Sequence, residues 1–531
     1  MAWLSVQLYR ALLARCRSHP LVRLAQLYDP HAVVEACRAY HHPSGPGAKP
    51  SYPVPVLVRA EIVRVWASSC SDPQLEQLLA SNLVARWYVG LPLLGPTPDH
   101  STLNRFHAWL TRNHPRTLFA DVLAFLDRVD PEDPATTPQI VDTFALQSAA
   151  APTSIAVLLW RLSGQLTDLW LSHAPLALQA ALPPLDLGPL SHPPSAWTRA
   201  QHQAQLASAV TLAIRLQTDL EPHLAALDPA LRGAVQGLLA LLAKVVSDET
   251  STDAQGHVVE RPPKDKGHYR LASAVDPEAT FRKHDQDDVV FGYNAAIATT
   301  ATRIRAAVVA TGSVSDSGAP VAVLQQQRDA ALALPPQVVM DQAAGWGKTR
   351  AEVDSVSDGQ TQVVALIPQS GGADLTRFTP ADFPVSLDGT TCTCPNGVVS
   401  TKAYASGQGD GLHFRFTAKQ CQGCPLWEQC RAVESKPGSH RTVYVTPYHA
   451  HLRAGAAFNL TVEGKALLQE RWQVEPTVAW LVRYDGCRRA RRVGQAAAQC
   501  QLYQACALRN LWRYLARAAR RGSPAAGEVC A

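Results

Sequence analysis

Three acidic residues stand within, or at the end of, elements of the chain that are expected to be rigid. Asp142 lies inside PQIVDTFAL (138–146), Asp341 closes PPQVVMD (335–341), and Glu475 lies in RWQVEP (471–476). Mg²⁺ prefers carboxylate oxygens, and two-metal phosphoryl transfer places two ions about 3.5–4 Å apart. Acids this distant in sequence must therefore meet in space, and neighbouring strands of one sheet can bring them together. We interpret the three as candidate catalytic ligands of Mg²⁺ or Mn²⁺.

Each of these acids also has a plainer interpretation. An Asp within or after a strand is commonly a turn residue, a helix cap or a surface charge. A Glu on a helix commonly faces solvent. The order of the three along the chain, rather than any one of them, favours a metal site.

Five of the twelve cysteines fall between residues 392 and 430. Twelve cysteines are too few for a disulfide scaffold in a chain of 531 residues. The clustering of five of them favours a metal-binding site over disulfides. A Cys-x-x-Cys turn presents two thiolates together, as tetrahedral zinc requires. The predicted structural Zn²⁺ set is Cys394, Cys421, Cys424 and Cys430, with Cys392 left over. Unligated buried thiols and a transient disulfide remain alternatives.

Positive charge is concentrated near the end of the sequence. The chain has a formal net charge of +5, but residues 471–531 alone carry eleven Arg against three acidic residues, a net charge of +8. Four of these arginines fall within YDGCRRARRVGQ (484–495), beside Glu475. Arginines bind phosphates independently of base sequence, so the segment favours a DNA contact, although a solvated surface would have the same composition.

The totals indicate several domains and no membrane segment. A chain of 531 residues, 47% hydrophobic, can form two to four domains. No window reaches the roughly 18 apolar residues of a membrane helix, and the first 20 residues lack a signal-peptide cleavage site. We therefore expect a cytoplasmic protein that does not contact a membrane.

The elements that must position the acids form a mixed α/β pattern. Residues 1–115 are predicted to be helical, with a capping box at Ser71 and Gln74. After the strand at 138–146, residues 152–247 are predicted to form helices and residues 248–270 a loop. The later core elements are predicted as a hairpin at 291–300 and 303–313, a helix at 319–334, strands at 335–341 and 362–368, and helices at 458–484, broken near Pro476, and 494–521.

Several segments, taken in order, resemble a known family. They are SDPQLEQLLASNLVARWYVGLP, PDHSTLNRFHAWL, IVDTFAL, DPEATFRKHDQDDVVFGYNAAIA, VVMDQAAGW, CPNG with CQGCPLWEQC, and RWQVEPTVAWLVRYDGCRRARRVGQ followed by LRNLWRYLAR. Over roughly residues 20–515 the chain resembles bacterial insertion-sequence transposases of the DDE class, and most of all the group numbered eleven-eighty-two.

The resemblance implies an RNase H-like fold in which Asp142, Asp341 and Glu475 bind the catalytic metal ions. It implies cleavage at transposon ends and joining of the freed 3′-hydroxyl to target DNA, with a homo-oligomer assembled on the DNA. Arg471 matches the Arg of an Arg-x-x-x-Glu pattern and would meet a DNA phosphate. Its alternative role is an i,i+4 ion pair with Glu475.

The resemblance also implies a basic residue seven positions after Glu475. Val482 stands there in this sequence, and Arg483 follows it. We expect Trp346 to pack in the core rather than to stack on a base. The predicted DNA-contacting residues are Arg471, Arg483, Arg488, Arg489, Arg491 and Arg492.

The predicted protein is an α/β DNA transposase with an RNase H-like mixed-sheet core, a helical N-terminal domain, a helical insert and a small cysteine-rich insert. Two alternatives remain: an inactive or repurposed zinc-containing DNA-binding protein, and an RNase H-like nuclease. The predicted division is a helical DNA-binding domain (1–115), a first core strand region (116–151), a helical insert and loop (152–270), the RNase H-like core (271–385), the cysteine-rich insert (386–445), catalytic and basic helices (446–521) and a tail (522–531).

Overall fold

The structure is a computed structural model. It describes residues 2–41, 52–182, 197–267, 269–283, 288–368, 377–386, 388–407, 410–431, 436 and 439–521. The predicted tail at 522–531 lies outside the described residues.

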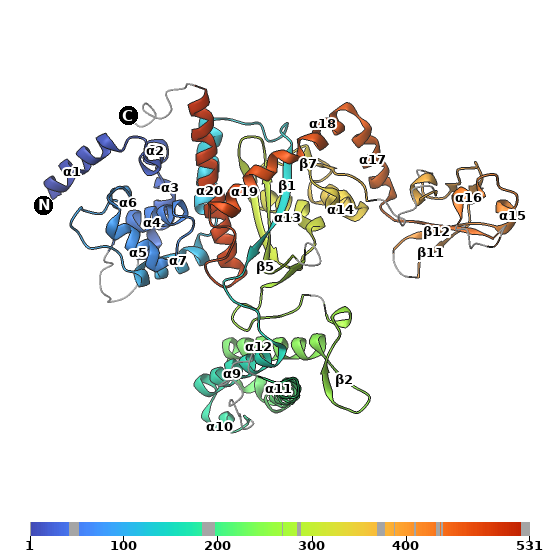
Figure 1. Ribbon diagram of the computed structural model, residues 1–531, viewed down its shortest axis with the longest axis horizontal. Coiled ribbons are helices and arrows are strands. Elements are labelled where there is room, and N and C mark those ends of the chain that lie inside the picture. The colour runs from blue at the N-terminus through green and yellow to red at the C-terminus, as the bar shows by residue number, and fades with distance from the viewer. Residues whose placement is uncertain are drawn as a thin grey trace.

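A mixed six-stranded sheet forms the centre of the molecule (Figure 1). Its order is β4-β5-β1-β7-β8, and β6 also pairs with β5. The first strand, β1, is antiparallel to β5 and parallel to β7, which is parallel to β8. The bounds are β1 Gln139–Gln147, β4 Thr280–Lys283, β5 Val289–Thr299, β6 Ile304–Thr311, β7 Gln337–Val339 and β8 Gln362–Val364. The predicted α/β fold with a mixed sheet and a helical N-terminal region is confirmed.

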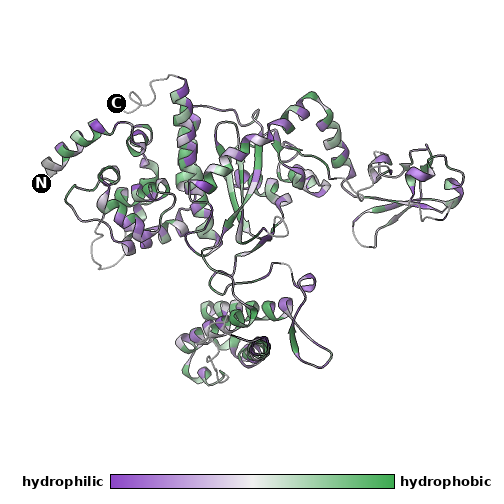
Figure 2. Cartoon of the chain, viewed as in Figure 1, coloured by the Kyte–Doolittle hydropathy of each residue, from purple (hydrophilic) through white to green (hydrophobic). Residues whose placement is uncertain are grey.

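Both faces of the sheet are buried, which explains the apolar runs in its strands (Figure 2). Ile140 and Ile297 pack into one core, whereas Val141 and Ala296 pack into the core of the other face. Helix α13 (Ala319–Asp329) contacts β1, β5 and β6, and α14 (Gly347–Val356) contacts α13 and β8. The 26-residue helix α20 (Gln495–Arg520) contacts β5 and β6 and also the helix α8.

The short helices between Ala2 and Val129 share a core with α20 and the sheet. The capping box predicted at Ser71 and Gln74 is present at the start of α5. The bounds are α1 Ala2–Arg15, α2 Pro20–Leu27, α3 His31–Ala36, η1 Arg38–His41, α4 Val54–Trp66, α5 Asp72–Ser81, α6 Leu83–Val89, α7 His100–Asn113 and α8 Thr117–Val129.

The helical region after β1 has a hydrophobic core of its own. Helices α9 (Ile155–His173), α11 (Arg199–Leu220) and α12 (Pro229–Glu249) pack against one another, with α10 at Leu176–Gln179 and η4 at Glu221–Ala226. A short hairpin of β2 (Thr250–Thr252) and β3 (Val258–Glu260) and the turn η5 (Pro263–Asp265) follow. Among the described residues only α12 is long and apolar enough to cross a membrane, and its leucines and valines pack inside this bundle.

The cysteine-rich region forms a lobe at one end of the molecule (Figure 1). It has its own small core, which includes Phe414 and Phe416 of β12. The bounds are β9 Cys392–Thr393, β10 Val399–Ser400, β11 Ala403–Ala405, β12 Leu412–Phe416 and β13 Arg441–Val445, with η8 at Pro380–Asp382, α15 at Ala418–Cys421 and α16 at Trp427–Cys430.

The helical segment before α20 is interrupted earlier than the sequence predicts. Helices α17 (His449–Leu460) and α18 (Val462–Glu470) are followed by the 3₁₀ turn η9 (Arg471–Val474) and by α19 (Glu475–Arg483). Pro476 lies in the first turn of α19, where its missing N–H has no intrahelical partner to lose. The break predicted near Pro476 is therefore at Arg471–Val474.

A strained turn fastens the N-terminal helices to the segment after α19. Ser68 and Ser69 both have left-handed backbones, with φ of 58° and 53°. The Ser68 hydroxyl donates to the Tyr484 carbonyl at 2.7 Å, and the Ser69 hydroxyl donates to the Asp485 carbonyl at 3.1 Å. Gly486 has φ of 81°, and a Cβ there would lie 2.5 Å from the Ser68 carbonyl oxygen. The two parts of the chain therefore touch backbone to backbone.

We expect Gly486→Ala to lower the free energy of unfolding by about 2–4 kcal/mol, because the added methyl group combines backbone strain with a steric clash. Gly90→Ala is the matched control, since Gly90 has φ of 85° and open space around it. It should lose only about 1 kcal/mol. Chemical denaturation measures the free energy of unfolding of each variant. Equal losses of stability in the two variants would contradict the tight contact at Gly486.

Candidate active site

The pairing of β1 with β7 brings two of the three acids together. Gln139 pairs with Val338 and Ile140 with Val339, in parallel register. Continued by two residues, that register places Asp142 beside Asp341. Side chains two residues apart share a face of a strand, so both acids follow Ile140 and Val339 on the same side of the sheet.

Asp341 is held at the point where β7 ends and a turn begins. Its carboxylate accepts a hydrogen bond from the Ala343 amide at 2.9 Å, which caps the 3₁₀ turn η7 (Gln342–Gly345). Gly345 lies against the end of β8, where a Cβ would come 1.9 Å from the Leu366 carbonyl oxygen. Asp341 is thus a helix cap and an exposed acid at once, in a turn that packs closely on the sheet.

A buried arginine supports the turn from behind. The Arg350 guanidinium donates to the carbonyl oxygens of Gly345 at 3.3 Å, Val363 at 2.6 Å and Ala365 at 2.8 Å. Burial lowers the pKa of Arg350 to about 10. Three carbonyl oxygens satisfy this cation, and together they tie the turn after Asp341 to β8.

Glu475 reaches the same place from a helix. It is the first residue of α19, and both α19 and η9 contact β1. The buried residues Val474 and Leu481 anchor the helix in the core, which leaves Glu475 exposed. Its carboxylate accepts a hydrogen bond from the Arg471 guanidinium at 3.1 Å, the i,i+4 pair that the sequence allows.

The charges at the site act on one another. Burial raises the pKa of Asp142 above its ordinary value, and the negative charges of Asp341 and Glu475 raise it further. The Thr143 amide, which donates to the Asp142 carboxylate at 2.8 Å, and the charge of Arg471 oppose that rise in pKa. Three acids and one arginine therefore form a single electrostatic group at the edge of β1 and β7.

The donor set of this group fits a hard cation. A bound positive ion stabilises carboxylates that lie close together, and their oxygens are the ligands that Mg²⁺ prefers. Within the described ranges, no three His, Cys, Asp or Glu side chains converge closely enough to hold an ion. Glu475 instead pairs with Arg471.

Two tryptophans near the acids are exposed. Trp346, which follows η7, has 53% of its surface exposed, and Trp472 in η9 has 60%. The predicted core packing of Trp346 is therefore wrong. Its neighbours Gly345 and Gly347 occupy the close contacts with β8 and α17, and the indole is directed outward between them.

The arginines after α19 divide into two groups. Arg483 and Arg488 are exposed, and Arg489 is exposed while donating to the Ala149 carbonyl at 3.1 Å. The other two hold the N-terminal helices. Arg491 donates to the Ser68 carbonyl at 3.2 Å, and Arg492 pairs with Asp72 at 2.6 Å.

Two further buried groups near α19 and the start of α20 have no role assigned from the sequence. Asp485 and Arg509 form a buried two-bond pair, both bonds 2.6 Å, and the Arg509 guanidinium lies 4.5 Å from the ring centre of Trp480. Burial raises the pKa of Asp485, and Arg509 opposes the rise. Asp276 is fully buried and accepts hydrogen bonds from Ser148, Tyr293 and the Gly494 amide at the start of α20. A pair that is distant in sequence, such as Asp485 and Arg509, can be recognised only once the fold is known.

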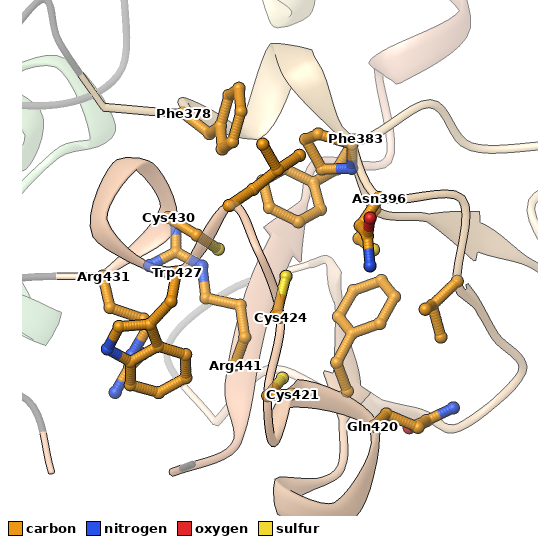
Figure 3. Close-up of a pocket in the computed structure, with 15 residues that line it drawn as sticks. Phe378, Phe383, Asn396, Gln420, Cys421, Cys424, Trp427, Cys430, Arg431 and Arg441 are labelled. Carbon is orange, nitrogen blue, oxygen red and sulfur yellow. The ribbon is translucent and has the colours of Figure 1, made fainter. Parts of the chain in front are cut away.

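The predicted zinc ligands line one pocket of the cysteine-rich lobe. Figure 3 shows Cys421, Cys424 and Cys430 in this pocket with Phe383 and Trp427, and Cys394 also lines it. Burial raises the pKa of the Cys421 and Cys430 thiols. The fifth cysteine, Cys392, is fully buried in the core of the lobe and does not line the pocket.

Two family models match the chain. Residues 393–515, which include Glu475 and the four pocket cysteines, match a transposase DDE domain. Residues 11–109, in the N-terminal helices, match a transposase domain of the group DUF772. Both matches are to transposase domains, and together they support a DDE-type insertion-sequence transposase. No curated protein and no solved structure matches it.

The matched transposase DDE domain indicates the reaction. A DDE transposase cleaves DNA and transfers the cut strand, so this transposase is an enzyme and binds DNA as its substrate. Enzymes of this class use a divalent metal ion. Asp142 and Asp341 lie outside both matched segments, and their assignment rests on the register of β1 with β7.

We expect Asp142→Asn to raise the melting temperature of the transposase at pH 7, because the amide removes a buried charge that Asp341 and Glu475 repel. A carboxyl whose folded pKa is raised lowers stability as the pH rises from its ordinary value, about 3.9, through the raised pKa. The difference in melting temperature between Asp142→Asn and the wild type should therefore shrink at about pH 3.

Thermal unfolding followed at both pH values measures this effect. Asp168→Asn, at an exposed position of α9, is the control and should change little at either pH. A melting temperature lower than that of the wild type for Asp142→Asn at pH 7 would contradict the crowding of negative charge at this site.

Proposed function

We propose that Asp142, Asp341 and Glu475 are the catalytic acids of this transposase and that they bind Mg²⁺, or Mn²⁺ in its place. The observation that carries the proposal is the parallel register of Ile140 with Val339, which supports a position of Asp142 beside Asp341 when it is extended by two residues. Bound there, the metal would supply Lewis-acid stabilisation of the attacking and leaving oxygens of a phosphodiester.

The protein's own groups determine where the DNA strand lies. Asp142 lies on β1, which pairs with β5 along one edge and with β7 along the other. Asp341 is held by its hydrogen bond from the Ala343 amide and by the turn that Arg350 supports. Glu475 is held by Arg471, whose guanidinium is one-third exposed. When a DNA phosphate takes the place of Glu475 as the partner of Arg471, the carboxylate becomes free to join the other two acids.

The exposed arginines beside α19 are proposed to contact the DNA backbone. Arg471, Arg483, Arg488 and Arg489 have exposed or partly exposed side chains. Arg491 and Arg492 were predicted to do the same, but their bonds to Ser68 and Asp72 favour a role in holding the N-terminal helices close to this surface. Those helices are proposed to bind the transposon ends.

The remaining features follow from the same proposal. The substrates are transposon-end and target DNA, and the transposase acts in the cytoplasm as a homo-oligomer assembled on DNA, without contacting a membrane. We also assign it to the insertion-sequence group numbered eleven-eighty-two, on the ordered sequence segments. The proposed domains are those predicted from the sequence, with the helical insert supported by a core of its own around α9, α11 and α12.

We expect Asp142→Asn, Asp341→Asn and Glu475→Gln each to lower Mg²⁺-dependent cleavage and joining at least about 1,000-fold, because each removes one carboxylate from the metal site. Binding of end DNA should persist. Glu470→Gln is the control, since Glu470 is exposed five residues before Glu475 and should leave both steps intact.

A gel assay of nicked and joined products on end-containing DNA measures both steps. Full activity in any of the three variants would contradict the assignment. Metal-dependent nicking without joining would favour the nuclease alternative, and binding without nicking in the wild type would favour a repurposed DNA-binding protein.

We also propose that Cys394, Cys421, Cys424 and Cys430 bind one structural Zn²⁺. Their shared pocket supports the proposal, and the small core of the lobe would depend on the metal for part of its folding energy. Four thiolates leave no position open for catalysis.

We expect the purified transposase to contain about one zinc per chain and Cys424→Ser to lose it, with a lower melting temperature. Cys392→Ala should keep the zinc, because Cys392 lies outside the pocket. Elemental analysis gives the metal content. A zinc-free wild type whose unfolding is insensitive to a chelator would overturn the proposal.

A further inference from the structure

An aromatic row crosses the three-stranded sheet of the cysteine-rich lobe. Tyr404 of β11 pairs with His413 of β12, and His413 pairs with Tyr444 of β13. The ring centres of Tyr404 and His413 are 5.4 Å apart and nearly parallel, and those of His413 and Tyr444 are 5.2 Å apart. Tyr404 is 49% exposed and Tyr444 is 42% exposed. We call these three residues the aromatic row.

The aromatic row is on the side of the sheet that does not form the core. Phe414, Phe416 and Val443 alternate with it along the strands and are buried in the lobe. On an exposed sheet face, alternation would ordinarily supply polar side chains. Three rings in register on that face leave apolar surface with no partner among the described residues of the lobe.

A row of polar and basic residues lies beside the rings. The Arg415 amide donates to the Lys402 carbonyl, and Arg415 pairs with Thr442, so these three continue the register. Each is two residues from a member of the aromatic row and therefore shares its face. Lys402 and Arg415 are exposed, and strands β11, β12 and β13 contain no acidic residue.

The rings are held in place before any partner arrives. His413 Nε2 lies 3.3 Å from the Ser406 hydroxyl. The Tyr444 ring lies against Gly411, where a Cβ would come 2.4 Å from the ring. Fixed aromatic rings beside cationic side chains are suited to a ligand that has flat apolar groups and, next to them, negatively charged groups.

We propose that this face binds unpaired DNA, with bases stacked on the aromatic row and phosphates at Lys402 and Arg415. Neighbouring in-register positions of a sheet are about 5 Å apart, a spacing that successive splayed bases can follow. Bases in a duplex are already stacked on each other, so only an unpaired strand presents open base faces. A second copy of the same face would bring Lys402 and Arg415 against like charges, which disfavours self-association.

The test uses the full-length transposase and two labelled strands, oligo(dT) and an abasic strand of the same length. Tyr404→Ala and Tyr444→Ala should each weaken oligo(dT) binding about tenfold and leave abasic binding unchanged, because only the bases stack. Tyr404→Phe keeps the ring and should bind as the wild type does. Arg415→Ala should weaken binding of both strands, since both carry phosphates.

Fluorescence anisotropy measures the affinities, and thermal unfolding verifies that each variant is folded. Tyr269→Ala, which removes an exposed tyrosine from another part of the chain, is the control and should bind both strands normally. Equal oligo(dT) affinity for wild type and Tyr404→Ala would overturn the proposal. So would an equal loss on the oligo(dT) and abasic strands, or a change in oligomeric state with DNA affinity unchanged. Cleavage at the acids is a separate readout and distinguishes failure here from failure of the catalytic assignment.

Discussion

The proposed site requires like charges to lie close together, and the backbone pairing of β1 with β7 holds them there. The register of Ile140 with Val339, continued by two residues, places Asp142 beside Asp341, although residues 143–340 separate them in the sequence. Burial and the negative charges of Asp341 and Glu475 raise the pKa of Asp142. The ionised form of Asp142 therefore lowers the stability of the fold. Such strain persists where the surrounding structure is rigid and a ligand is expected to relieve it.

The remaining structure can be understood as support for that pairing. β5 covers the other edge of β1, and Arg350 ties the turn after Asp341 to β8. Glu475 arrives on α19, whose far end is fixed twice, by the buried Asp485–Arg509 pair and by the Ser68–Ser69 turn. Because that turn belongs to the N-terminal helices, a change in those helices on binding DNA would reach α19 directly. The cysteine-rich lobe, by contrast, has a separate core.

Much of the sheet could be predicted because its strands are short apolar runs bounded by turn residues. PQIVDTFAL, FGYNAAIATT and QVVALIP all contain strands, and Ser71 forms its capping box. Register could not be predicted, because pairing between distant segments depends on packing that local propensity does not describe. The exposure of Trp346 could not be predicted for a similar reason, since it depends on the close contacts that the glycines on either side make. The contacts of Arg491 with Ser68 and of Arg492 with Asp72 could not be predicted either, because composition does not reveal which residues lie side by side.

The central claim is that three acids from β1, the end of β7 and the start of α19 form one metal site. Electron paramagnetic resonance of Mn²⁺, titrated into the full-length transposase bound to end DNA, tests it without relying on turnover. The account predicts tight Mn²⁺ binding in the wild type that is strongly weakened in Asp142→Asn, Asp341→Asn and Glu475→Gln alike, and retained in Glu470→Gln. Mn²⁺ binding that is unchanged in Asp341→Asn would contradict it.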